Sequence, residues 1–134
     1  MKKFILYTDG AARGNPGPAG AGAFICTGDG HAVAEVAEYL GETTNNVAEY
    51  RALIAGLKKL IEMGAEEIEV RADSELMVRQ IQGRYRVKHP NLKPLFEEAI
   101  ALLKKIGRYS IKHVEREKNK EADRLANQAI DEHF

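Results

Sequence analysis

Residues 4–10 read Phe4-Ile5-Leu6-Tyr7-Thr8-Asp9-Gly10, a short apolar run that ends in an acidic residue and a glycine. A run of this kind predicts a strand over residues 4–8. The stretch that follows, residues 11–22, is dense in glycine, proline and alanine, which predicts a loop. Residues 23–27 and 32–40 predict two more strands, joined as a hairpin by the turn Gly28-Asp29-Gly30. The first third of the chain is therefore expected to form an antiparallel meander.

The hydrophobic period becomes helical from Val47 onward. One stripe of a helix collects the apolar residues Val47, Tyr50, Ile54, Leu57 and Ile61, and Gly64 stands where a C-terminal cap is expected. Residues 67–72 alternate between apolar and polar, which predicts a fourth strand whose end carries Asp73. A short helix over residues 74–82 is expected to follow.

The last third continues with the same signals. Pro94 suits the first turn of a helix that runs to Ile106, residues 109–114 predict a fifth strand, and a final helix begins near Asn119. The order is three strands, a helix, a strand, two helices, a strand and a helix. This order predicts an α/β fold with a mixed five-stranded sheet, its first three strands antiparallel, and helices on both faces.

The composition is typical of one soluble globular domain covering residues 1–134, with 44% hydrophobic and 30% charged residues in 134. The apolar run near the N-terminus is too short for a signal peptide or a membrane span, so a cytoplasmic protein without a membrane partner is expected. Cys26 is the only cysteine, which excludes an intramolecular disulfide and a cysteine-rich zinc site. Any metal must be held by oxygens or imidazoles.

The formal net charge is zero, yet the basic residues are unevenly placed. Between Leu76 and Phe96 there is no acidic residue, while five basic ones occur: Arg79, Arg84, Arg86, Lys88 and Lys93. This segment is either an ordinary solvated face or a surface for nucleic-acid phosphates.

Four acidic residues stand where a sheet presents its functional edge. Asp9 and Asp73 end strands, Glu49 lies in the first turn of the long helix, and Asp123 borders the apolar stripe of the last helix. Grouped carboxylates are the natural ligands of a hard cation such as Mg²⁺ or Mn²⁺.

Each acid also has a purely structural interpretation. Asp9-Gly10 could be a turn, Asp73 could cap the following helix, and Asp123 could offset a helix dipole. Glu49 has the strongest alternative, because Asn46 three residues before it makes a variant of the capping box.

Four ordered blocks make the sequence resemble the type 1 ribonuclease H family over essentially its whole length. The blocks are Tyr7-Thr8-Asp9-Gly10 with Gly14-Asn15-Pro16-Gly17-Pro18, then Thr43-Thr44-Asn45-Asn46-Val47-Ala48-Glu49, then Asp73-Ser74-Glu75, and finally His113 with Asn119-Lys120-Glu121-Ala122-Asp123. The resemblance implies a ribonuclease H-like fold and hydrolysis of the RNA strand of RNA/DNA hybrids. It also implies that Asp9, Glu49, Asp73 and Asp123 bind two Mg²⁺ or Mn²⁺ ions, with Asp9 the best candidate for a shared ligand.

The resemblance extends to residues around the metal site. It implies proton transfer or product release for His113. It implies contacts to the hybrid from Asn15, Thr44, Asn45, Asn46, Ser74 and Asn119. Two departures stand out: Glu75 is acidic where many relatives carry an amide, and the basic, tryptophan-bearing insertion of some members is absent. Arg84, Arg86 and Lys88 are expected to bind the hybrid in its place, but more weakly.

Two other functions remain open at this stage. One is a catalytically silent module that binds hybrids, and the other is a related two-metal nuclease acting on double-stranded RNA or on DNA. For the ribonuclease H function and for both alternatives, a monomer without an obligate protein partner is expected.

Overall fold

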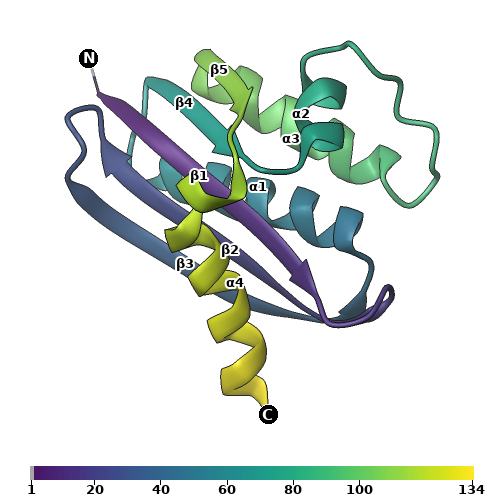
Figure 1. The fold of residues 1–134 in the computed structure, drawn as a ribbon. Helices are drawn as coiled ribbons and strands as arrows, with labels where there is room; N and C mark the ends of the chain where they lie inside the picture. Colours follow the sequence, from purple (N-terminus) through teal and green to yellow (C-terminus); the bar gives the residue numbers. More distant parts are fainter. Residues whose placement is uncertain (1) are drawn as a thin grey trace.

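The computed structural model describes residues 2–134 (Figure 1). Its elements are, in chain order, β1 (Lys3–Ala12), β2 (Gly17–Thr27), β3 (Ala32–Thr43), α1 (Asn45–Glu62), β4 (Glu67–Ala72), α2 (Glu75–Ile81), α3 (Lys93–Ile106), β5 (Arg108–His113), the short 3-10 helix η1 (Arg116–Lys118) and α4 (Lys120–His133). The five strands form one sheet in the order β3-β2-β1-β4-β5. β1 pairs antiparallel with β2, and β2 antiparallel with β3. β4 runs parallel to both β1 and β5, so the predicted mixed sheet with an antiparallel first half is confirmed.

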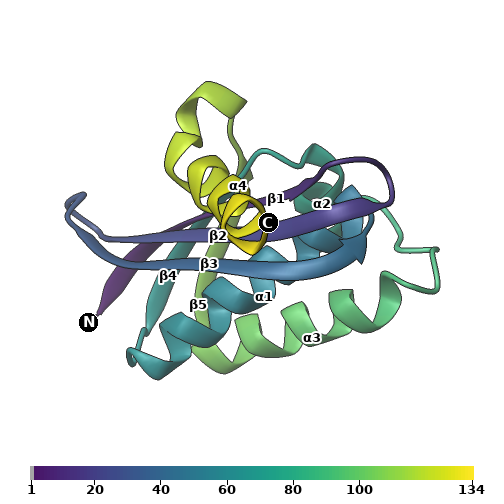
Figure 2. The ribbon, with the colours of Figure 1, turned by 90° about the horizontal axis from the view of Figure 1, so that it is seen from below.

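Helices cover both faces of the sheet, as predicted. Figure 2 shows α4 on one face and α1 with α3 on the other. The main core lies on the α1 face, where Leu6 and Val70 of the central strands are fully buried with Leu53 and Leu57 of α1. Gly56 lets α1 approach closely, because a Cβ at this position would lie 2.6 Å from Leu6 Cδ1. The central strand β1 is therefore held firmly between helices on either side.

The loop predicted for residues 11–22 is wrong, because most of this stretch belongs to β1 and β2 and only residues 13–16 connect the two strands. The small residues serve the packing of α4 across β2. A Cβ at Gly20 would lie 2.2 Å from the Ala126 carbonyl oxygen, and one at Gly22 would lie 2.2 Å from the Ala122 carbonyl oxygen. The glycine and alanine residues of this stretch favour a loop locally. They form a strand because α4 packs closely against them.

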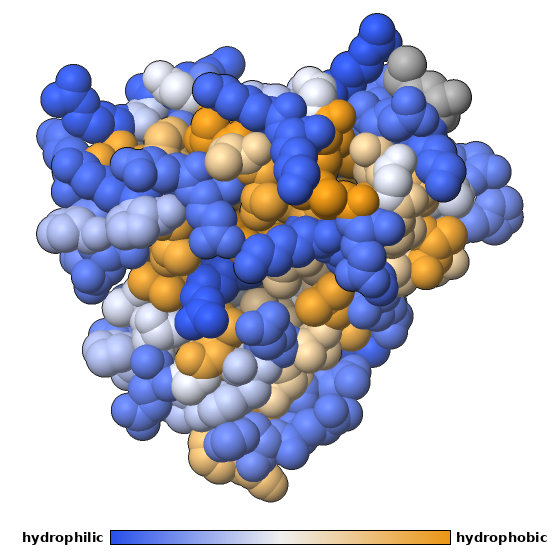
Figure 3. Space-filling view, turned by 180° about the vertical axis from the view of Figure 1, so that it is seen from behind, coloured by the Kyte–Doolittle hydropathy of each residue, from blue (hydrophilic) through white to orange (hydrophobic). Residues whose placement is uncertain are grey.

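The face of the molecule that carries α1 and α3 bears both apolar and hydrophilic side chains (Figure 3). Figure 3 shows the face behind the sheet, where small apolar patches alternate with hydrophilic side chains. A groove between α1 and α3 on this side includes Val47, Ile54 and Leu95 among its lining residues. None of the helices in residues 2–134 combines the length and the apolar composition needed to cross a bilayer.

Candidate active site

Three carboxylates meet where β1 and β4 part. The two strands stay paired as far as Thr8 and Ala72, so the next residues, Asp9 and Asp73, flank the opening between them. Glu49 reaches the same opening from α1. One carboxylate oxygen from each of these residues lies within 4.8 Å of the others. They line an open cavity of about 390 Å³ together with Gly10, Asn45, Asn46, Ser74 and Arg116.

The fourth predicted acid, Asp123, reaches this cluster from α4 on the other face of the sheet. Its side chain lies close enough to Asp9 to contribute to the raised pKa of that residue. The Asn127 Nδ2 donates to the Asp123 carbonyl oxygen at 3.0 Å and to Asp123 Oδ1 at 3.3 Å, which fixes the carboxylate. The structure thus brings Asp9, Glu49 and Asp73 within 4.8 Å of one another, and Asp123 adjoins this group at Asp9.

Glu49 is positioned by the glycine that follows Asp9. The Gly10 amide donates to Glu49 Oε1. A Cβ at Gly10 would lie 2.2 Å from the Ala48 carbonyl carbon and 2.3 Å from the Glu49 nitrogen, so only glycine allows α1 to come this close to β1. The hydrogen bond and the close approach together aim Glu49 at Asp9.

The capping-box interpretation of Glu49 is therefore wrong. Thr44, not Asn46, is the N-cap of α1, and its Oγ1 accepts from the Val47 nitrogen at 3.3 Å. β3 extends to Thr43, so the helix begins immediately after it and Glu49 falls in the second turn, beyond reach of the cap. Glu49 therefore has no role in capping α1, and its carboxylate belongs to the acidic cluster only.

The electrostatics of the cluster favour a bound cation. Asp9 is 5% exposed and Glu49 is 7% exposed. Burial and the neighbouring charges of Glu49 and Asp73 raise the pKa of Asp9 far above its ordinary value. Burial also raises the pKa of Glu49, although the Gly10 amide partly offsets this rise. Like-charged carboxylates at this distance need either protons or a metal ion, and an all-oxygen donor set suits Mg²⁺ or Mn²⁺.

The polar residues before α1 form a second part of the site. Asn15 Oδ1 accepts from the Asn45 nitrogen, and Asn45 Oδ1 accepts from the Ala12 nitrogen, each at 3.1 Å. These two bonds fix the loop at residues 13–16 against the start of α1. Asn15, Thr44 and Asn46 also line a cavity of about 200 Å³ together with His89, Asn91 and Leu92.

His89 and Asn91 were missed as site residues by sequence reasoning. Both belong to the segment between α2 and α3, whose charge had drawn attention to its arginines and lysines instead. The sequence signal that could have identified them is their position as two polar residues at the end of a basic segment. Arg84, Arg86 and Lys88 are exposed on the same segment, and none of them lines the carboxylate cavity.

Ser74 lies at the edge of the carboxylate cavity. Its Oγ accepts from the Met77 nitrogen at 3.3 Å as the N-cap of α2, and its hydroxyl also hydrogen-bonds with Glu49. Glu75, the next residue, pairs with Arg79 at 2.8 Å on the exposed side of α2.

His113 lines a different cavity, with Tyr7, Arg71 and Lys112, and its implied role in proton transfer or product release stays a prediction. After β5 the chain turns through η1, and this turn places Arg116 at the carboxylates instead. Counting residues back from Asp123 could not reveal such a turn.

Asn119 also needs correction, since it is 1% exposed and cannot reach a substrate from that position. Its Nδ2 donates to the Thr8 carbonyl oxygen at 2.8 Å. This bond ties the start of α4 to β1 directly before Asp9. Asn119 therefore positions Asp123 relative to Asp9.

The chain is similar in sequence and in structure to known proteins. A family model described as reverse transcriptase-like matches residues 7–129. A bifunctional protein of Mycobacterium tuberculosis is 49% identical over 130 residues, which are 96% of this chain and 36% of that protein. The chain thus spans about a third of the length of this relative.

Two solved structures are similar over nearly their full length. The ribonuclease H1 of the archaeon Halobacterium salinarum has a TM-score of 0.94 and 44% identity, covering 97% of this chain and 98% of that chain. The LC11 ribonuclease H1, solved in complex with an RNA/DNA hybrid, has a TM-score of 0.93 and 49% identity, with the same coverage of each chain.

Proposed function

The chain belongs to the ribonuclease H family, and from this membership we propose that it is an endonuclease that hydrolyses the RNA strand of RNA/DNA hybrids, leaving 5′-phosphate and 3′-hydroxyl ends. The observation that carries the proposal is the meeting of Asp9, Glu49 and Asp73 within 4.8 Å, with Asp123 next to Asp9. A silent binding module would not need such a cluster. Its acids would serve as helix caps, and Glu49 does not.

The four carboxylates would hold two divalent cations, Mg²⁺ or Mn²⁺. When bound, such ions lower the pKa of an attacking water and stabilise charge on the phosphate and on the leaving 3′-oxygen. Asp9 is the candidate for the shared ligand, because it alone adjoins all three other acids. The amide of Gly10 and the hydroxyl of Ser74 hold Glu49 in place for its share of the coordination.

The polar surface next to the carboxylates would bind the substrate. Asn15, Thr44 and Asn46 offer amide and hydroxyl groups for sugar and phosphate contacts, and His89 and Asn91 extend this surface toward the basic segment. Contacts of this kind read the 2′-hydroxyls and the shape of an A-like minor groove, with little base specificity. The zero net charge leads us to expect weak, strongly salt-dependent binding.

The direct test incubates the protein with an end-labelled RNA/DNA hybrid in the presence of Mg²⁺ or Mn²⁺. We expect internal cuts in the RNA strand and none without a divalent ion. Double-stranded RNA and duplex DNA in parallel reactions test the alternative of a two-metal nuclease with another substrate. Cleavage of duplex DNA but not of the hybrid, or no cleavage with either ion, would rule out the proposed function.

Arg116 is expected to matter more for turnover than His113. Arg116 lines the carboxylate cavity, and its positive charge can stabilise charge on the phosphate, so Arg116→Ala should lower kcat about 10²-fold, as loss of one charge-stabilising donor does. His113→Ala should leave kcat within a few-fold of the original. Steady-state cleavage of the hybrid measures both variants, and Arg116→Lys separates charge from geometry. The reverse ranking of the two alanine variants would contradict this assignment.

A further inference from the structure

Two neighbouring cavities lie beside the carboxylate site and have no part in the proposed cleavage. The first has a volume of about 280 Å³ and an apolar wall made by Ile5, Tyr7, Phe24 and Cys26. Its remaining lining is polar and includes Glu117, Lys118, Lys120 and Glu121. The second has a volume of about 640 Å³ and is lined by Arg71, Lys112, His113 and Lys118, with Glu115 as its only carboxylate. Tyr7 and Lys118 line both, so the apolar cavity adjoins the cationic one.

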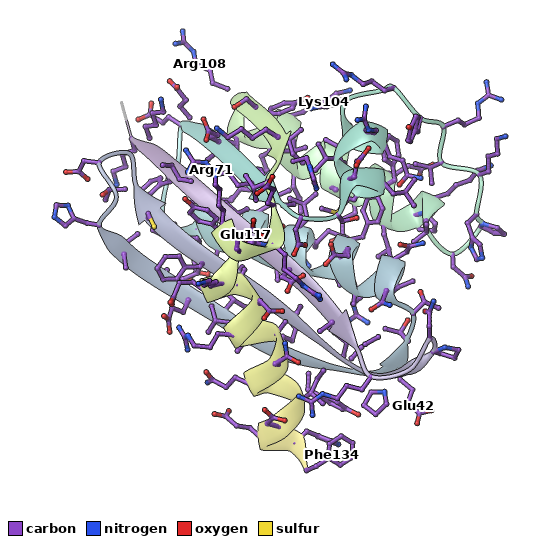
Figure 4. The ribbon with its side chains drawn as sticks, viewed as in Figure 1. Glu42, Arg71, Lys104, Arg108, Glu117 and Phe134 are labelled. Carbon is purple, nitrogen blue, oxygen red and sulfur yellow. The ribbon has the colours of Figure 1, made fainter. Side chains whose placement is uncertain are left out.

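The position of α4 explains why these cavities are open. This helix packs across β1, β2 and β3, and none of the α-helices in residues 2–134 covers the same face of β4 and β5 (Figure 1). Side chains of β4 and β5 that point to this face are left uncovered. Figure 4 shows Arg71 of β4 on this face, near Glu117 of η1.

The cationic groups are held in place by their neighbours. Arg71 donates from Nε to Glu69 Oε2 and from a terminal nitrogen to the Tyr7 hydroxyl at 2.6 Å, and its guanidinium lies 5.4 Å from the centre of the Tyr7 ring. Lys112 Nζ lies 3.5 Å from Glu69 Oε2. Glu69 thus orients two cations, while Lys118 approaches from η1. Arginine and lysine fixed in this way suit a phosphate group.

We propose that the two cavities form one binding site for a nucleoside phosphate. The phosphate lies among Arg71, Lys112 and Lys118, and the base enters the slot beside Ile5, Phe24 and Cys26. An inorganic anion would use only the cationic half, whereas a ligand with a flat apolar end and an anionic end fills both. The ligand is either a free nucleotide or the terminal nucleotide of a nucleic acid, since both present the same groups.

This site is distinct from the carboxylate centre. The single turn of η1 separates them, because Arg116 lines the carboxylate cavity while Lys118 lines the two cavities described here. The proposal therefore does not depend on hybrid cleavage and is tested by binding alone. Measurements without divalent ions keep a phosphate away from the acidic cluster by repulsion.

The first experiment compares AMP, adenosine and inorganic phosphate by calorimetry and by backbone amide shifts in NMR spectra. AMP should bind about tenfold tighter than either fragment, because the base adds stacking to the phosphate contacts. AMP and adenosine should shift the amides of Ile5 and Phe24, which phosphate should not. Equal binding of AMP and phosphate would overturn the proposal, and so would shifts confined to other surfaces.

The second experiment removes the cations. Lys112→Gln with Lys118→Gln should weaken AMP binding about tenfold and leave adenosine binding unchanged. Lys104→Gln with Lys105→Gln, which removes the same charge from the exposed end of α3, is the matched control and should change neither (Figure 4 labels Lys104). Equal loss of AMP binding in both double variants would refute the site.

Oligonucleotides identify the source of the ligand. Displacement of AMP by a short DNA strand with a 5′-phosphate, but not by its 5′-hydroxyl counterpart, supports a site for nucleic-acid ends. AMP binding that the phosphorylated strand does not displace supports a site for a free nucleotide.

Discussion

Replacing Asp9 with asparagine is expected to lower the rate of hybrid cleavage by about 10³-fold or more, as is typical when a central catalytic group is removed. Asp9 adjoins Glu49, Asp73 and Asp123, so asparagine at this position removes the charge that would serve two cations at once. The side chain keeps nearly the same volume, and the surrounding packing should survive. Single-turnover cleavage of a labelled hybrid measures the loss. Full activity in Asp9→Asn would contradict the assignment of this site.

The stability of the same variant gives an independent check. Because the pKa of Asp9 is raised in the folded protein, the folded state binds a proton that the unfolded state has released, and stability falls as pH rises from the ordinary pKa toward the raised one. Asparagine removes this penalty. In a chelator, Asp9→Asn should therefore unfold at a higher temperature than the original protein at pH 8, with a smaller difference at pH 4. Adding Mg²⁺ or Mn²⁺ should stabilise the original protein and not the variant. A variant that is less stable at pH 8 without metal would argue against the repulsive cluster.

The second large effect is expected from Gly22→Ala. The new methyl group would lie 2.2 Å from the Ala122 carbonyl oxygen and 2.6 Å from the Ala126 nitrogen, and both are backbone atoms that move only if α4 moves. Overpacking of this kind costs about 1–3 kcal/mol of stability. The shift also separates Asp123 from Asp9, so cleavage should fall together with the melting temperature.

Gly28→Ala is the matched control for this change. It lies in the same hairpin, and its methyl group would be 3.7 Å from the nearest atom, the side chain of Lys3, which is ordinary contact. Thermal unfolding and hybrid cleavage of both variants test the packing argument. Equal behaviour of the two would show that the approach of α4 to β2 does not matter.

Sequence patterns predicted the parts of the fold that depend on local signals. The strand ends at Asp9 and Asp73 and the helical stripe beginning at Val47 follow from periodicities of two and 3.6 residues. Residues 11–22 could not be assigned in this way, since glycine and alanine favour a loop locally. Only the position of α4, whose sequence lies at the other end of the chain, makes Gly20 and Gly22 necessary in a strand.

The candidate site could also be predicted only in part. Acidic residues at strand ends can be found from the sequence, because the end of a strand fixes where they point. His113, Arg116 and Asn119 follow one another closely in the chain, and a single turn of η1 decides which of them meets the carboxylates. No pattern within so short a segment distinguishes a buried amide from an exposed one.

The dependence of the site on α4 has a consequence during synthesis. Asp9 lies on β1, whereas Asp123 lies on α4 and reaches Asp9 only when that helix lies across Gly20 and Gly22. A nascent chain that has been synthesised only as far as β5 therefore holds three of the four carboxylates. Such a chain would lack one ligand of the proposed metal site, so the order of translation delays the assembly of that site.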